Sequence, residues 1–382
     1  MLKKKSALIE LNRSNRAISS RRLRRQRQGG ALYSGSRKNP RHSKRRYRQV
    51  RIIAPSMIGL TNPKSHLALV SFLDQFEKAT RAVSSGSATI LVCFRNTKHI
   101  EASGGIYLLA RTELIVRMHP KVQFKISKPP KIPHGSLKAA KSIVHDVLCQ
   151  IGYYKALRLA STRGPSLPHV ECWQVLTATK VESKVLGEAI DKLTPLGVNG
   201  TLLYRAGIEA LSNAAEHAYS DLDGVSRTFR EKRWWLFTAV LNNELIVYVC
   251  DLGHGIPVTL PFTQEPNVLK EAMKRVISRL PPQAKKVLSI REGDALQIAT
   301  STLIKETRTS LTYRGKGGND IKSFIDSNPS AEVRIYSNRG YWRYKNMPSQ
   351  SRKSEIGMGY NNKRSINGTI VGWAVPVSPD AF

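Results

Sequence analysis

Residues 234–257 read WWLFTAVLNNELIVYVCDLGHGIP, and this stretch decides the fold of the second half of the chain. Two apolar runs flank the Asn-Asn dipeptide at 242–243, a pattern typical of a β-hairpin. The second run ends directly in Asp251, and Gly253 and Gly255 follow at alternate positions. An acidic side chain at a strand end can accept a hydrogen bond from a ligand, and glycines allow the backbone to approach that ligand closely. The sequence therefore predicts a hairpin that ends in a ligand-binding loop.

One helix is predicted upstream of the hairpin, over residues 201–219, TLLYRAGIEALSNAAEHAY. Its apolar residues recur at helical spacing, which gives the helix a face for the core. Glu209, Asn213 and Glu216/His217 follow one another in steps of three to four, so they project from one side of the helix. A carboxamide oxygen at Asn213 can coordinate Mg²⁺ between nucleotide phosphates, and a carboxylate at Glu209 can orient or deprotonate a nucleophile.

These two segments together resemble the GHKL family, the ATPase fold shared by DNA gyrase, histidine kinases and anti-sigma serine kinases. Glu209-x-x-x-Asn213 looks like the N-box of the family, and Asp251-x-Gly253-x-Gly255-Ile resembles its first glycine box. The resemblance implies ATP and Mg²⁺ as cofactors, with Glu209 as the catalytic carboxylate and Asn213 as the metal ligand. It also implies that Asp251 reads the exocyclic amine of adenine.

Two later segments are similar to the remaining boxes of the family. Arg-Gly-Lys-Gly-Gly at 314–318, followed by a predicted helix over 319–326, looks like the second glycine box, although Gly318 stands where the family more often has Leu. Asn-Gly-Thr-Ile-Val at 367–371 resembles the last box, which begins the closing strand. Residues 258–314 would then hold the lid over the nucleotide. The implied cofactor-binding set is Asp251, Gly253, Gly255, Gly315, Lys316, Gly317, Gly368 and Thr369.

The first half of the chain predicts a smaller unit of alternating strands and helices. Such an order implies a small parallel or mixed sheet covered by helices. Helical spacing or short β-rich runs place the predicted helices at 63–84, 103–117 and 136–150 and the strands at 88–94 and 122–126.

The turn between the first of these strands and the next helix reads Glu101-Ala102-Ser103-Gly104. Together with the strand–helix order, this turn resembles a STAS domain, a family that includes the anti-sigma factor antagonists. The family usually has Asp-Ser-Ser-Gly here, so the aspartate position is altered. The resemblance implies that Ser103 accepts phosphate; the alternative is that Ser103 only caps the helix.

The expected fold class is α+β. We expect a disordered basic tail over 1–55, a STAS-like α/β domain over 63–160, and a GHKL domain over 180–377. The GHKL resemblance implies a mixed sheet with helices on one face.

Charge is concentrated at the start of the chain. Residues 1–51 hold 18 Lys or Arg and one acidic residue, Glu10, which amounts to +17 of the total formal charge of +35. Few large apolar residues interrupt this segment, so we expect it to be disordered alone. Its charge predicts binding to nucleic acid or another polyanion, and a solvated tail is the alternative.

Three further features bound the class of protein. No run of about 18 apolar residues is present, so no transmembrane segment is expected. The basic N-terminus is not followed by an apolar stretch, which argues against a secretory signal. Four widely spaced cysteines fit reduced thiols and a cytoplasmic location.

A nucleotide site does not define the output, so several functions stay open. A serine/threonine protein kinase of the anti-sigma type is favoured by the STAS-like neighbour, and an ATPase that switches binding to nucleic acid or a protein is nearly equal. A histidine kinase would need a phospho-accepting histidine such as His145, and a nucleotide-gated binding module needs no catalysis. We expect a protein partner, either a phospho-acceptor or a STAS-type regulator, and a homodimer is a further alternative.

Overall fold

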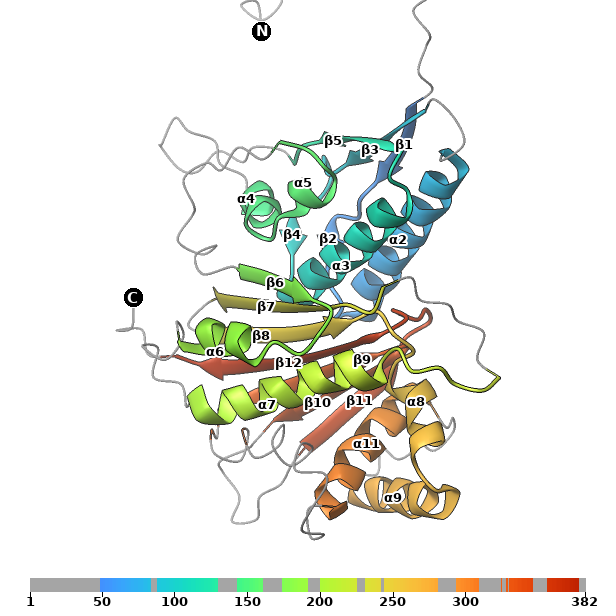
Figure 1. Cartoon of the computed structure of the whole chain (residues 1–382), viewed down its shortest axis with the longest axis vertical. Helices are drawn as coiled ribbons and strands as arrows, with labels where there is room; N and C mark the ends of the chain where they lie inside the picture. The colour runs from blue at the N-terminus through green and yellow to red at the C-terminus, as the bar shows by residue number, and fades with distance from the viewer. Residues whose placement is uncertain are drawn as a thin grey trace, which may run out of the picture. The chain divides into compact units, whose positions relative to one another are not determined.

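The computed structural model describes residues 49–83, 88–129, 143–160, 174–191, 200–224, 231–241, 244–280, 293–308, 324, 328, 330–345 and 356–377. These residues form an α+β structure, as the sequence predicts (Figure 1). Apart from the first 46 residues, the chain forms one compact unit.

A small parallel sheet opens the described part of the chain. Its strand order is β1-β3-β5, and α2 and α3 are the connections that return the chain to the same end of the sheet. Beside it lies a short parallel pair, β2 and β4. The elements of this region are β1 (Gln49–Ile53), β2 (Met57–Ile58), α2 (Pro63–Val83), β3 (Thr89–Cys93), β4 (His99–Ile100), α3 (Ala102–Met118), β5 (Gln123–Ser127), α4 (Ile143–Gln150) and α5 (Tyr153–Ala156).

The alternation of strands and helices expected in this region is confirmed, with one correction at its start. Residues 49–53 belong to β1 and pair with β3 through the register Val50–Ile90 and Ile52–Val92, so the tail cannot extend to residue 55. In the sequence, arginines interrupt the apolar residues of this strand, so its β pattern is hard to recognise. Ile52 is nevertheless buried. Part of the helix predicted over 136–150 lies outside the described residues, and α4 accounts for the remainder.

A second, larger sheet dominates the rest of the described chain. Its strand order is β11-β10-β9-β12-β8-β7-β6. Every neighbouring pair among these strands is antiparallel, so the expectation of a mixed sheet is wrong for the described residues. The strands are β6 (Gln174–Ala178), β7 (Trp234–Leu241), β8 (Glu244–Asp251), β9 (Glu332–Ser337), β10 (Gly340–Lys345), β11 (Ile356–Asn361) and β12 (Thr369–Pro376).

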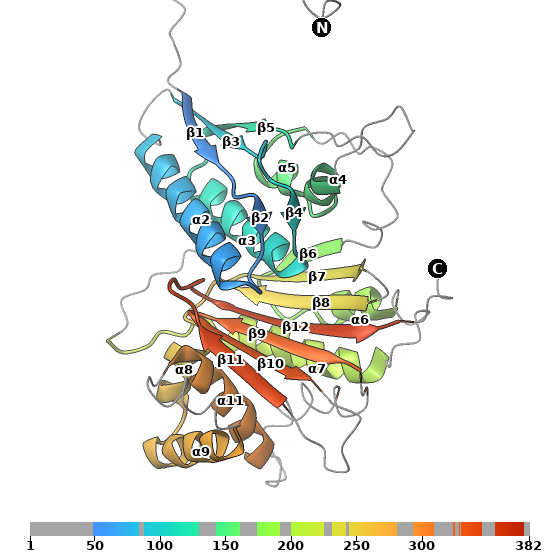
Figure 2. The ribbon, with the colours of Figure 1, turned by 180° about the vertical axis from the view of Figure 1, so that it is seen from behind.

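Helices cover one face of this sheet, and α7 lies in front of it in Figure 1 and behind it in Figure 2. The stretch expected to hold a lid is largely helical where the structure describes it. Buried side chains such as Leu260, Ala272 and Leu296 fix these helices to the same core. The elements are α6 (Ser183–Asp191), α7 (Gly200–Ser212), a π-helical turn (Asn213–His217), α8 (Ile256–Thr263), α9 (Pro266–Arg279) and α11 (Asp294–Arg308).

Alternating residues of the large sheet enter two different hydrophobic clusters. Trp234 and Leu236 of β7 pack with the helices just described, whereas Trp235 and Phe237 pack with side chains of the N-terminal region. Both faces are therefore buried. The helices that follow β6 cover one face, as expected for this domain, and the N-terminal region covers the other. Burial on both sides also explains why this strand reads as a continuous apolar run.

Polar contacts join the N-terminal region to the large sheet as well. The indole Nε1 of Trp235 donates to Oε2 of Glu113 at 2.8 Å, and Thr61 Oγ1 lies 3.1 Å from the hydroxyl of Tyr336. The regions predicted over 63–160 and 180–377 thus share one core.

The structure tests two further expectations only in part: that the cysteines are reduced, and that the chain has no transmembrane segment. Cys93, Cys149 and Cys250 are free and buried, and Cys172 lies outside the described residues. Among the helices that the structure describes, none combines the length and the apolar character needed to cross a bilayer.

Candidate functional site

Helix α7 and the π-helical turn that continues it carry the two residues expected to act on the phosphates, Glu209 and Asn213. One side of this helix places Leu203, Ala206 and Leu211 in the hydrophobic core between the helices and the large sheet. On the same helix, Nδ2 of Asn213 donates to Oε1 of Glu209 at 3.1 Å. The expectation that the carboxylate and the carboxamide share one side of the helix is therefore confirmed.

The helix widens where Asn213 begins a π-helical turn. The N–H of Ala218 donates to the carbonyl of Asn213 at 2.9 Å, a bond that spans five residues instead of four. Such turns are rare and occur frequently at functional sites. Helical periodicity gives no signal for the extra residue, so the sequence predicts an ordinary helix here.

The end of this helix contacts the glycine loop that follows β8. The N–H of His254 donates to the carbonyl of Ala218 at 2.7 Å. A Cβ built on Gly253 would lie 2.1 Å from that carbonyl oxygen, so only glycine fits between the two segments. Gly255 has φ +83°, a conformation that other residues rarely adopt. The two motifs that carry the resemblance are thus adjacent in space.

Asp251 lies at the end of β8 and is buried. Its Oδ1 accepts hydrogen bonds from the N–H of Gly253 at 2.9 Å and from the N–H of Thr369 at 3.2 Å. No residue that the structure describes donates to its Oδ2. Burial raises the pKa of Asp251 to about 7, although the two N–H donors act in the opposite direction.

The last box joins the same site. Thr369 begins β12 and pairs with Asp251 in the register of β8 and β12. Its hydroxyl lies 2.9 Å from Oγ of Ser337, which in turn accepts the N–H of Ile256 at 2.8 Å. The structure thus places Thr369 directly beside Asp251.

Sequence reasoning missed Ser337 and Asn338 at the turn between β9 and β10. Nδ2 of Asn338 donates to the carbonyl of His254 at 2.9 Å, and its N–H donates to the carbonyl of Gly368 at 3.1 Å. Asn338 adopts φ 50°, which asparagine tolerates better than most residues. The Ser-Asn-Arg-Gly stretch is a readable turn signal, but nothing in the sequence links that turn to the glycine loop.

Tyr219 is a second residue that the sequence does not single out. Its hydroxyl accepts the N–H of Leu252 at 3.0 Å and donates to the carbonyl of Arg233. Burial holds the pKa of this hydroxyl well above its usual value, so it stays protonated. Tyr219 thereby ties the segment after the π-helical turn to the first residue after Asp251.

The expected phosphate-side residues Gly315, Lys316 and Gly317 lie outside the described residues, as does the predicted helix over 319–326 apart from Phe324. The structure therefore describes three of the four segments that carry the resemblance, at 209–213, 251–256 and 367–371, and brings these three together.

Ser103 does not occupy the position expected of a phospho-acceptor or a helix cap. Helix α3 begins at Ala102 with Glu101 as its N-cap residue, so Ser103 lies within the first turn and is 2% exposed. The carboxylate of Glu101 instead accepts the N–H groups of Leu60 and Thr61 at 3.1 and 3.2 Å. In this conformation a kinase cannot reach the Ser103 hydroxyl.

His145, considered as a phospho-acceptor in a histidine kinase, lies on α4. Its Nδ1 is 2.6 Å from the hydroxyl of Tyr154. It belongs to the small N-terminal region and not to a helical hairpin of its own.

The chain was compared with protein-family models, with curated proteins and with solved structures, and none of the three comparisons found a match.

Proposed function

We propose that this chain is an ATP- and Mg²⁺-binding regulatory protein of the GHKL class. The observation that carries the proposal is the arrangement at Asp251. Two backbone N–H groups orient its Oδ1, whereas Oδ2 receives no donor from the described residues. Asp251 is only 6% exposed, and its Oδ2 remains open to a donor from a ligand. The exocyclic amine of adenine is a donor of the right kind.

The helix beside the glycine loop supports a metal–phosphate role. Nδ2 of Asn213 donates to Glu209, so Oδ1 is the end of the amide suited to a cation. Mg²⁺ commonly takes one or two protein ligands and completes its shell with phosphate oxygens and water. No group of three or more His, Cys, Asp or Glu side chains that could hold a metal occurs among the described residues. A metal at Asn213 would therefore depend on the nucleotide.

For the output, we propose phosphoryl transfer to a serine or threonine of a separate protein, as in anti-sigma kinases. Glu209 would orient or deprotonate the accepting hydroxyl. A separate acceptor is favoured because Ser103, the candidate within this chain, is 2% exposed.

Hydrolysis coupled to a conformational switch is the second candidate. It is favoured by the core that the N-terminal region shares with the large sheet, in which Trp235 and Tyr248 contact the same cluster as α2 and α3. A change at the nucleotide site could reach the N-terminal helices through this packing.

Calorimetry with ATP and GTP tests the nucleotide proposal. Wild-type protein with Mg²⁺ should bind ATP, and GTP should bind weakly, because guanine has a carbonyl where adenine has the amine. Asp251→Asn offers an amide in place of the carboxylate and should reduce that preference. Equal affinity for the two nucleotides in the wild type would contradict the role of Asp251.

γ-Labelled ATP separates the two outputs. The label should appear on an added protein if the chain is a kinase, and as free phosphate if it is an ATPase. Glu209→Gln is the control, since it should abolish either signal while ATP still binds. If wild-type protein binds ATP and yields neither product, a nucleotide-gated binding module replaces both candidates.

A further inference from the structure

The loop between β11 and β12, residues Asn362–Gly368, is held on two sides. On one side it contacts the candidate site: the N–H of Ile366 donates to the carbonyl of Asn338 at 2.9 Å, and the carbonyl of Gly368 accepts the N–H of Asn338 at 3.1 Å. Thr369 follows directly and donates to Asp251. The loop thus determines where one of the two N–H donors to Asp251 lies.

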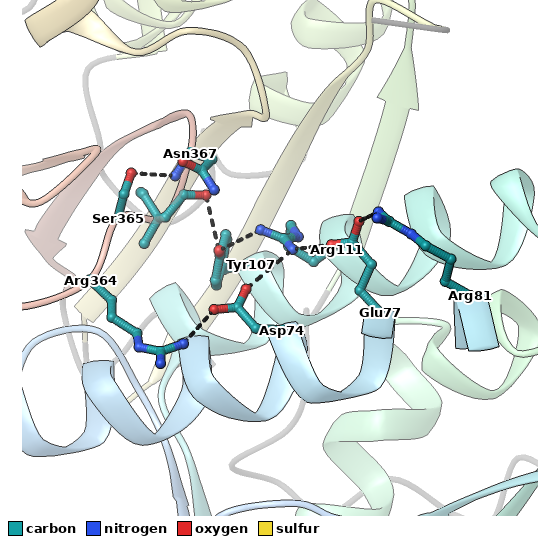
Figure 3. A network of polar contacts seen from close by, with 9 residues as sticks. Asp74, Glu77, Arg81, Tyr107, Arg111, Arg364, Ser365 and Asn367 are labelled. Carbon is teal, nitrogen blue, oxygen red and sulfur yellow. Dashed lines mark hydrogen bonds and ion pairs between the residues drawn. The ribbon is translucent and has the colours of Figure 1, made fainter. Parts of the chain in front are cut away.

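On its other side the loop contacts the N-terminal helices (Figure 3). The hydroxyl of Tyr107 on α3 donates to the carbonyl of Ile366 at 2.9 Å. Arg364 of the loop donates to Oδ2 of Asp74 on α2 at 2.7 Å. Tyr107 and Ile366 are both fully buried, whereas the ion pair lies at the surface.

Arg111 determines the direction of the Tyr107 hydroxyl. Its side chain is only 8% exposed and forms ion pairs with Glu77 at 2.8 Å and Asp74 at 3.7 Å. The same guanidinium donates to the Tyr107 oxygen at 3.3 Å. Because arginine only donates, it occupies an acceptor position of that oxygen and leaves the hydroxyl hydrogen for Ile366.

Burial raises the pKa of Tyr107 to about 12, so this hydroxyl remains a donor over the physiological range. A buried arginine is costly to desolvate unless its partners are well placed. Glu77 and Asp74 supply those partners. They hold the Arg111 guanidinium in place, and Arg111 in turn directs the Tyr107 hydroxyl to the loop.

We propose that Tyr107, oriented by Arg111, is a positioning residue for the nucleotide site, acting from the N-terminal region through the loop 362–368. Its hydroxyl bonds Ile366 and Arg111, neither of which belongs to the proposed metal or nucleotide site. It holds the Ile366 carbonyl, which fixes the loop and thereby the Thr369 N–H against Asp251. The predicted effect on ATP binding rests on the proposed function. The predicted effect on the position of the loop 362–368 does not.

The test compares Tyr107→Phe with Tyr153→Phe in the full-length chain. Tyr153 is an equally buried tyrosine of the same core, and its hydroxyl forms no hydrogen bond with the described residues, those of the loop included. Hydrogen exchange of the backbone amides of Ile366 and Thr369 should accelerate about 3- to 10-fold in Tyr107→Phe only, as expected for one lost hydrogen bond. ATP affinity should fall by a similar factor in the same variant, at matched thermal stability.

The pKa of the Asp251 carboxyl, measured by carbon-detected NMR, adds a quantity that general destabilisation of the fold should not change. Weakening the Thr369 donor should raise the pKa of Asp251 above that of the wild type in Tyr107→Phe and leave it unchanged in Tyr153→Phe. Arg364→Gln, at an exposed position of the same loop, is the second variant should Tyr107→Phe fail to fold, and it should accelerate exchange in 362–369.

The outcomes separate the two proposals. If wild-type protein does not bind ATP but Tyr107→Phe accelerates exchange at Thr369, the proposed function fails and the positioning role stands. If exchange, the Asp251 titration and ATP affinity are the same in Tyr107→Phe and Tyr153→Phe, the positioning role is overturned.

Discussion

The backbone N–H of Thr369 donates to Oδ1 of Asp251 at 3.2 Å, across 118 positions of the chain. The same two residues face each other in the register of β8 and β12. A side-chain contact between directly paired residues fixes the direction of the carboxyl plane. Oδ1 is therefore turned toward the backbone, and Oδ2 accepts no hydrogen bond from the residues that the structure describes.

Adenosine binding should depend on pH through Asp251. Burial raises its pKa to about 7, and the ionised carboxylate is the stronger acceptor for an amine. Affinity should fall by up to about tenfold per pH unit below 7. Calorimetry with adenosine avoids the titration of ATP phosphates, and Asp251→Asn should bind weakly without this pH dependence. A wild-type affinity that is flat between pH 5 and 8 would count against the assignment.

Asp251 should also make the protein less stable as pH rises. Its pKa is raised from 3.8 to about 7 on folding, so between these values the folded chain holds a proton that the unfolded chain has lost. The stabilisation is complete below about pH 4 and is lost as pH rises through 7, with a slope of at most about 1.4 kcal/mol per pH unit. Asp251→Asn should remove this slope in denaturant unfolding, whereas Asp223→Asn, at an exposed aspartate, should follow the wild type.

Substitutions at Glu209 and Asn213 should differ in kind. Glu209→Gln keeps an oxygen for Asn213 to donate to, so ATP should still bind while turnover falls by about 10²–10⁴-fold. Asn213→Ala should weaken Mg²⁺-ATP binding itself, which calorimetry with and without Mg²⁺ can resolve. Glu216→Gln, at an exposed position of the same π-helical turn, should leave both quantities unchanged. Loss of ATP binding in Glu209→Gln would reverse the roles.

Gly253→Ala should destabilise the protein where Gly187→Ala does not. The new methyl group at residue 253 would lie 2.1 Å from the carbonyl oxygen of Ala218, and backbone cannot move aside cheaply. We expect a loss of about 1–3 kcal/mol in unfolding free energy. In α6, a methyl group at residue 187 meets Tyr204 at 3.8 Å, an ordinary contact, and alanine should gain up to about 1 kcal/mol as a better helix former. Equal changes in unfolding free energy for Gly253→Ala and Gly187→Ala would mean that the glycine loop can move away from Ala218.

Removal of residues 1–46 should weaken binding to RNA and DNA and flatten its salt dependence. Residues 1–46 contain 16 Lys or Arg and only one acidic residue, Glu10. Each phosphate neutralised on a duplex contributes about −0.9 to the slope of log K against log salt. The truncation stops before Gln49 because residues 49–53 form β1. Identical slopes for the two proteins would assign polyanion binding to the remainder of the chain.

Much of the described fold is readable from the sequence because local patterns are strong. The helices at 63–83 and 102–118 and the strands at 89–93 and 123–127 lie within a few residues of their predicted bounds. The hairpin of β7 and β8 follows from two apolar runs around an Asn-Asn turn, and Leu241 does pair with Glu244. The spacing of Glu209 and Asn213 likewise predicts their contact.

What the sequence could not predict depends on contacts between distant segments. Nothing in β9 indicates that Ser337 reaches Thr369, and nothing in α3 indicates that Tyr107 reaches Ile366. The π-helical turn at Asn213 has no periodic signature. The second covered face of the large sheet was missed because an apolar run does not say which element lies on each side.

The position of β12 has a consequence for how the protein is made. β12 lies between β8 and β9, and pairs with both. Until residues 369–376 leave the ribosome, the strand groups β6–β8 and β9–β11 each present an unpaired inner edge in the middle of what will be a single sheet. Such edges are prone to pair with other chains. A nascent chain stalled before Gly368 would therefore contain the strand groups β6–β8 and β9–β11 without the strand that joins them. In that chain Asp251 would have only one of its two backbone donors.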